Sequence, residues 1–146
     1  MSATNAFETS LLGLIITNAA ALNVGDAGGL LPSAAAGVFW ISLCTASPGE
    51  TGDQTTNETV YTNYARQDEA RNTTQWTVTG NTADNDNAVG FPQCGATGAT
   101  LTDFGLGSAS TAAGNLFLFG ALTASLVVSN GVTPSFAAGA LDITLD

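Results

Sequence analysis

The first segment of the chain has the apolar spacing of a helix. Four large apolar residues recur at i, i+4, i+7 and i+8 and so share one helical face: Phe7, Leu11, Leu14 and Ile15. Leu12 and Ile16 lie off that face, so the helix is apolar over more than half of its circumference. A helix with such a wide apolar surface is buried on two sides or packs against a partner chain.

Polar residues mark the limits of this helix. Asn5 is a suitable N-cap, and Glu8 follows three residues later, which resembles a capping box. Asn18, an alanine run and a glycine-rich stretch end the periodic pattern. We therefore expect a helix over residues 5–17, followed by an irregular arm over residues 18–36.

From residue 37 onward the pattern changes to short segments typical of β-strands. The first, Val38 to Cys44, is dense in aromatic and branched side chains. The further candidates are residues 60–66 with a continuation to about residue 70, then 76–79, 88–91, 99–106, 115–122, 136 and 141–145. Asn130-Gly131, between residues 125–129 and 132–133, predicts a hairpin with a type I′ turn. Residues 81–87 are polar apart from Ala83 and predict a solvated turn.

Short strands separated by turns predict a mainly β fold, with a β-sandwich or jelly-roll over residues 37–146 and one N-terminal helix. The 146 residues are enough for one domain, and we expect a single domain over 1–146. The start of the chain lacks the basic residues of a secretory signal, and its apolar run, residues 11–16, is shorter than the ~20 residues that span a bilayer. The sequence therefore predicts a soluble product made in the cytoplasm.

The charge composition excludes several classes of function. Twelve acidic residues stand against two basic ones, which gives a formal net charge of −10, and the chain has no His and no Lys. A chain with so few cations cannot neutralise a row of phosphates or dock on an anionic membrane, so we expect no nucleic acid and no membrane among its partners. The absence of His and Lys removes the commonest catalytic bases and Schiff-base chemistry. We expect a non-enzymatic protein without a cofactor.

Two groups of acidic residues are candidate cation sites. Asp84 and Asp86 alternate within one polar stretch, as calcium ligands often do, but the positions that follow do not complete an EF-hand loop. Glu50, Asp53 and Glu58 lie in the long polar loop 47–58. A solvated turn is the favoured interpretation of both groups, and we expect no bound metal.

The remaining candidate side chains are aromatic residues and thiols. Trp40 and Trp76 could stack on a sugar, although both lie within strand patterns, where packing in the core is the usual role. Cys44 and Cys94 form no metal-binding motif. Two buried free thiols are favoured for them, and one disulfide is the alternative.

The two cations of the chain, Arg66 and Arg71, are close in sequence, with Asp68 and Glu69 between them. A local ion pair is the simpler interpretation of each. The alternative is a contact across a subunit boundary, because arginine is a frequent anchor of protein interfaces. Arg66 and Arg71 therefore join the six apolar helix residues as candidate interface residues.

Several segments carry a resemblance to a known group of proteins. They are residues 23–33, 38–58 and 61–66, with Trp76-Thr-Val, Phe91-Pro, Phe104-Gly-Leu-Gly107, Gly120-Ala-Leu122 and the ending 134–145. Over nearly the whole chain, the sequence resembles small virion proteins of tailed bacteriophages, usually labelled tail fibre proteins. The resemblance implies a structural role in the virion.

Size and composition favour one member of this class, a capsid cement or head decoration protein. Such a protein would bind the major capsid protein on the outer surface of the head and associate with itself, as a homotrimer. A tail or tail-fibre component that contacts the host surface is the alternative, and a carbohydrate-binding module is the third possibility. The expectation of a cement protein depends on the premise that a fibre protein would show sequence repeats or a coiled-coil stalk, neither of which is visible.

Overall fold

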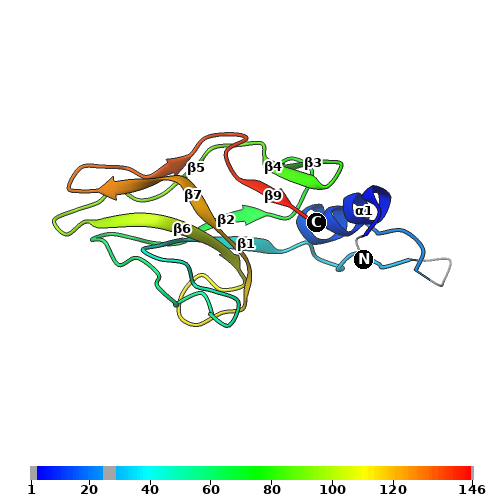
Figure 1. Ribbon diagram of the computed structural model, residues 1–146, viewed down its shortest axis with the longest axis horizontal. Helices are drawn as coiled ribbons and strands as arrows, with labels where there is room; N and C mark the ends of the chain where they lie inside the picture. The colour runs from blue at the N-terminus through cyan, green and yellow to red at the C-terminus, as the bar shows by residue number, and fades with distance from the viewer. Residues whose placement is uncertain (1–2, 25–28, 146) are drawn as a thin grey trace. The chain divides into compact units, whose positions relative to one another are not determined.

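The structure is a computed structural model that describes residues 3–24 and 29–145 (Figure 1). In this part of the chain there are one helix and nine strands, arranged as three antiparallel sheets that do not close into a barrel. The prediction of a mainly β fold with one N-terminal helix is confirmed. The chain divides into two compact units. The first takes in the chain up to Gly37, Ala70–Ala88 and the segment from Phe136, and the second consists of Val38–Glu69 and Val89–Ser135.

The helix α1 (Asn5–Thr17) belongs to the first unit and has the predicted length. Its N-cap is Thr4, not Asn5, because the Thr4 hydroxyl accepts a hydrogen bond from the Phe7 amide and its own backbone is extended. The helix ends at Asn18, which has the left-handed conformation (φ 57°) that stops helices. The Asn18 side chain also exchanges two hydrogen bonds of 2.9 Å with the backbone of Ser33, which ties the arm to the end of the helix.

Helix α1 packs against β3 (Trp76–Thr79) and β4 (Thr82–Asn85). Its buried line consists of Glu8, Leu12 and Ile16, and the four-residue stripe predicted from the sequence is partly or largely exposed. The side chains of Trp76 and Ala83 have no exposed surface. On the helix, the core of this unit therefore includes Leu12 and Ile16, the two apolar residues that lie off the predicted stripe.

The sheet of the first unit has the order β3-β4-β9, with β9 at Asp142–Thr144. Trp76 faces Asn85, and Ala83 faces Ile143. The prediction of a solvated turn over residues 81–87 is wrong for Thr82–Asn85, which form β4. Its inward residues are a small alanine and an asparagine, so the alternation of buried and exposed positions is not visible as an alternation of large apolar residues.

Asn85 is buried and connects β4 to the last segment of the chain. Its amide nitrogen donates to the carbonyls of Asn87 (2.7 Å) and Ala137 (2.9 Å). Its side-chain oxygen accepts from the amides of Ala140 (3.0 Å) and Leu141 (2.8 Å). A polar residue can occupy this core position because all four bonding positions of its amide are used.

The main sheet of the second unit has the order β2-β1-β6-β7. Its strands are β2 (Gln67–Ala70), β1 (Val38–Cys44), β6 (Ala99–Gly107) and β7 (Leu116–Val128). Ile41 faces Leu106, which in turn faces Leu118. These apolar rows, together with Leu43 and Leu101, make the core of the unit. A separate two-stranded sheet pairs β5 (Val89–Gly90) with β8 (Ser135–Phe136).

Two strand predictions are wrong in this unit. Residues 60–66 form a turn with Asn63 at φ 77°, and the strand begins only at Gln67. The Asn130-Gly131 turn does form, with the Val132 amide 2.9 Å from the Ser129 carbonyl. No hairpin surrounds it, because residues 125–128 are the end of the long strand β7 and residues 132–133 are not in a strand.

Candidate functional site

Arg66 lies at the centre of a polar cluster in the second unit. Its guanidinium binds the Glu58 carboxylate with both ends, Nε to Oε1 and Nη2 to Oε2, each at 2.6 Å. Three carbonyls also accept from it: Ala109 (2.7 Å), Ala112 (3.0 Å) and Gln54 (3.0 Å). Arg66 is therefore a buried cation in a bidentate ion pair with Glu58. Its partner is not Asp68 or Glu69.

The bonds of Arg66 join two loops. Gln54 and Glu58 lie in the loop that follows β1, while Ala109 and Ala112 lie in the loop between β6 and β7. Gln54 is itself buried: its side-chain oxygen accepts from the Ala109 amide (2.8 Å), and its nitrogen donates to the Trp40 carbonyl (3.3 Å). The two loops are thus fixed to each other and to β1 by hydrogen bonds from buried side chains.

The polar cluster shifts the pKa of two neighbours. The Tyr64 hydroxyl donates to Glu58 Oε1 (2.8 Å) and accepts from the Leu43 amide (3.1 Å). Burial is the main reason that the pKa of Tyr64 lies well above its ordinary value. Burial, aided by the charge of Glu58, raises the pKa of the Cys44 thiol to about 11. Both groups are therefore uncharged at neutral pH and supply no nucleophile or base.

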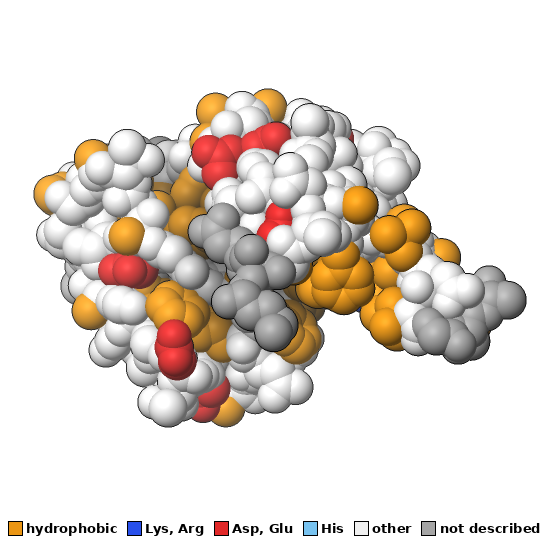
Figure 2. Space-filling model, turned by 45° about the vertical axis from the view of Figure 1, so that its right-hand side comes forward, with side chains coloured by type: hydrophobic (Ala, Val, Ile, Leu, Met, Phe, Trp, Pro, Cys, Tyr) orange, Lys and Arg blue, Asp and Glu red, His pale blue; other side chains and the backbone are white. Residues whose placement is uncertain are grey.

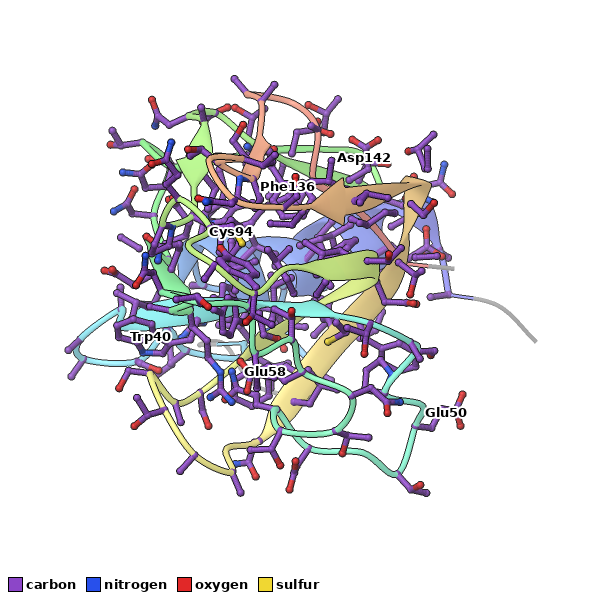
Figure 3. All side chains as sticks on the ribbon, turned by 90° about the vertical axis from the view of Figure 1, so that its left-hand side faces the viewer. Trp40, Glu50, Glu58, Cys94, Phe136 and Asp142 are labelled. Atoms are coloured by element: carbon purple, nitrogen blue, oxygen red, sulfur yellow. The ribbon has the colours of Figure 1, made fainter. Side chains whose placement is uncertain are left out.

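A hollow of about 250 Å³ opens beside this cluster, lined by residues 58–60, 64–66 and 110–112. Ser110 and Thr111 are exposed at its border, and Val60 is 87% exposed. The Thr59 hydroxyl is buried and has no hydrogen-bond partner among the described residues. Figure 3 shows Glu50 at the outer end of the loop that follows β1, and Glu58 within that loop. The hydrogen bonds of Arg66 and Gln54 connect the two loops that line this hollow.

Arg71 lies in the first unit and stabilises the end of α1. Its guanidinium donates to the carbonyls of Ile15 (2.6 Å), Leu14 (2.8 Å) and Ala36 (3.0 Å). Carbonyls at the C-terminal end of a helix lack partners within it, so a cation is favourable there. Both arginines thus bind within their own unit. The face drawn in Figure 2 shows acidic side chains and no basic one.

The six helix residues predicted as a contact surface divide by exposure. Leu12 and Ile16 are core residues, while Phe7 is 36% exposed and Leu11, Leu14 and Ile15 are half-buried. The arm after the helix adds exposed apolar side chains at Leu22, Val24, Leu30 and Leu31. Whether these residues contact another subunit stays a prediction.

The other candidates from the sequence do not assemble into a site. Trp76 is fully buried and cannot stack on a sugar. Among the described residues, no three Asp, Glu or Cys side chains gather as a metal would require. Cys44 and Cys94 are buried free thiols, as favoured from the sequence. In the part of the chain that the structure describes, no helix has the length and apolar character needed to cross a bilayer.

Sequence reasoning missed one surface, the strand β7. This strand is 13 residues long and lies at the end of the four-stranded sheet. Four of its apolar side chains are exposed: Phe117 (50%), Phe119 (39%), Leu126 (37%) and Val127 (66%). The sequence does contain an uncharged run from Leu116 to Val128. The hairpin predicted at residue 130 divided this run between two strand candidates, residues 115–122 and 125–129.

Comparison with known proteins overturns the expectation of a capsid cement protein. A search of curated proteins finds no match. A family model described as podophage GP4 fiber I protein gp80 matches residues 5–144. The predictions of a cement function, of binding to the head and of a location on the capsid surface are therefore wrong. They assumed that a fibre protein would show sequence repeats or a coiled-coil stalk, but compact units without repeats are compatible with a fibre protein. The chain belongs to the Gp80 family and is a structural, non-enzymatic tail fibre protein of the phage virion.

Proposed function

We propose that this tail fibre protein contacts the host surface during adsorption, through the hollow that the loops of the second unit enclose. The observation that supports this proposal is the set of hydrogen bonds made by Arg66, Glu58 and Gln54. These bonds hold two irregular loops, the one after β1 and the one between β6 and β7, in one arrangement. Binding surfaces are often built from loops on a rigid scaffold, because a fixed loop loses little entropy when it binds.

The chemistry of the hollow favours a neutral polar ligand. Glu58 neutralises Arg66, so the cluster beneath the hollow carries no unpaired charge. The hydrogen-bonding groups that a ligand can reach are the exposed hydroxyls of Ser110 and Thr111 at the border, while the Thr59 hydroxyl is buried. A hydroxyl-bearing group of a cell-surface polymer would suit these donors and acceptors.

Adsorption of engineered phage tests this proposal. We expect Val60→Lys, at the border of the hollow, to slow adsorption, because it places a long cation over the opening. The Gly90→Ala phage is the control, since its Cβ would enter open space. Heads should release DNA at the same temperature in all three phages, because the protein belongs to the tail fibre. Unchanged adsorption of the Val60→Lys phage, with the protein present in its virions, would show that the hollow does not contact the host.

A further inference from the structure

The strand β7 has one backbone edge without a neighbouring strand. In the described residues, β7 is the last member of the order β2-β1-β6-β7 and pairs only with β6. The pairing is irregular at two points: residues 122–125 form a bulge between the pairs Leu101–Leu126 and Asp103–Ala121, and Phe117 is left out between the pairs Leu106–Leu118 and Gly107–Leu116. The bulge divides β7 into two arms, Leu116–Ala121 and Leu126–Val128.

This edge has a bulge but lacks two other features that keep a soluble protein from pairing through its strands, charge and proline. Natural edge strands usually carry charged residues or proline, which block the approach of another strand. β7 has 13 residues, and none of them is charged or proline. Both arms expose apolar side chains, at Phe117 and Phe119 in the first arm and Leu126 and Val127 in the second. Apart from its bulge, β7 therefore has the properties of a strand that is covered in the assembled protein.

The charge of the molecule indicates what covers it. Two copies of a chain with a net charge of −10 repel each other over most of their surfaces. The uncharged β7 is a surface at which two copies can approach with little local repulsion, whereas a basic partner would find its opposite charges in the acidic loops and not on this strand. An antiparallel pair across a two-fold axis is self-complementary, so the apolar side chains of one copy meet those of the other.

We propose that β7 is a subunit interface, at which the β7 edges of two copies of this chain pair as antiparallel strands. Backbone hydrogen bonds extend the sheet across the axis, and the exposed phenylalanine and valine side chains are buried beside it. This interface is independent of the proposed host contact, which uses the loops of the same unit.

Sedimentation of the full-length chain at micromolar concentrations tests the interface. We expect the wild type to be a dimer and Val127→Lys to be a monomer, because Lys places a charge on the exposed edge. Val60→Lys is the matched control: it makes the same change of residue and charge at a position outside β7, and should remain a dimer. A second variant, Phe119→Lys, places a charge on the other arm at an exposed position and should also dissociate the dimer.

Two outcomes would overturn the proposal: a monomeric wild type, or Lys variants that associate as the wild type does. Circular dichroism checks that each variant is folded. If the variants do not fold, amide hydrogen exchange of the wild type decides. We expect slower exchange in β7 at high protein concentration than at low concentration. Exchange in β7 that is independent of concentration would contradict the proposal, even if the chain formed the trimer expected from its sequence.

Discussion

Gln54 occupies the space above Gly107, so closely that a Cβ at position 107 would overlap the Gln54 side chain. Gly107 is the last residue of β6, and Gln54 comes from the loop after β1. The missing side chain of the glycine therefore allows a buried amide to reach the Trp40 carbonyl and the Ala109 amide. This relationship explains why the end of β6 has no larger residue.

We expect Gly107→Ala to destabilise the protein by about 1–3 kcal/mol, as overpacked core substitutions do. Gly90→Ala is the control: Gly90 lies in β5, its Cβ would meet nothing within 4 Å, and its φ is not positive. Urea unfolding followed by circular dichroism gives both free energies. Equal stability of the two variants would mean that Gln54 can leave its position without cost.

Removal of Arg66 should be strongly destabilising, because it leaves a buried charge without its partner. Arg66→Met leaves the Glu58 carboxylate and three loop carbonyls without their donor, and breaking a buried pair in this way costs about 3–5 kcal/mol. Asp68→Asn, on an exposed residue of β2, should change the free energy of unfolding by less than about 0.5 kcal/mol. Thermal unfolding measures both. A small loss for Arg66→Met would indicate that water enters the loops and replaces the guanidinium.

The thiol of Cys44 should be unreactive in the folded protein. Its pKa of about 11 leaves almost no thiolate at pH 8, and its side chain is buried. Because the Cys94 side chain is buried as well, we expect no release of thionitrobenzoate from Ellman's reagent at pH 8 under native conditions. The same sample in guanidinium chloride should react at both Cys44 and Cys94, since they are free thiols. Rapid reaction of the native protein would show that the loops over β1 open readily.

Asp84 and Asp142 face each other across β4 and β9 and make the stability of the first unit pH-dependent. A hydrogen bond with Asp142 is the first cause of a raised pKa at Asp84, followed by burial and the repulsion of the Asp142 charge. A raised pKa in the folded state means that this pair stabilises the fold below the unfolded pKa of about 3.9 and that the contribution is lost as pH rises through the folded pKa.

We therefore expect Asp142→Asn to be more stable than the wild type at pH 7, by about 0.5 kcal/mol, because it removes two like charges that face each other. The gain should be smaller at pH 4 than at pH 7, because the raised pKa of Asp84 lets that carboxylate take up a proton more readily. Urea unfolding at the two pH values measures this difference. Asp68→Asn changes the net charge equally and should not show the same dependence. A gain for Asp142→Asn that is the same at both pH values would contradict the assignment.

The sequence predicts elements well where burial follows a strong apolar pattern. β1 and β3 lie where the aromatic and branched residues indicate, and α1 has its predicted bounds. β4 could not be recognised, because its inward positions are Ala83 and Asn85, and Asn85 is compensated by partners more than fifty residues away in sequence. The pattern of residues 60–66 predicted a strand, but Tyr61, Tyr64 and Arg66 are spaced for a turn that buries their side chains.

The candidate site was harder to predict than the fold. Arg66 could be singled out as a rare cation, yet its pairing with Glu58 and with the carbonyls of Ala109 and Ala112 depends on how distant loops meet. Edge position is equally invisible in a sequence: the composition of β7 suits a buried strand, and only the strand order shows that one side of it is open.

The chain passes between its two units four times, after residues 37, 69, 88 and 135. As a result, no single cut in the polypeptide can release either unit as an intact piece. Cleavage of the connection after Ala88, for example, would leave two fragments that each contain part of both units. After such a cut, each unit would be held together only by noncovalent contacts between the two fragments.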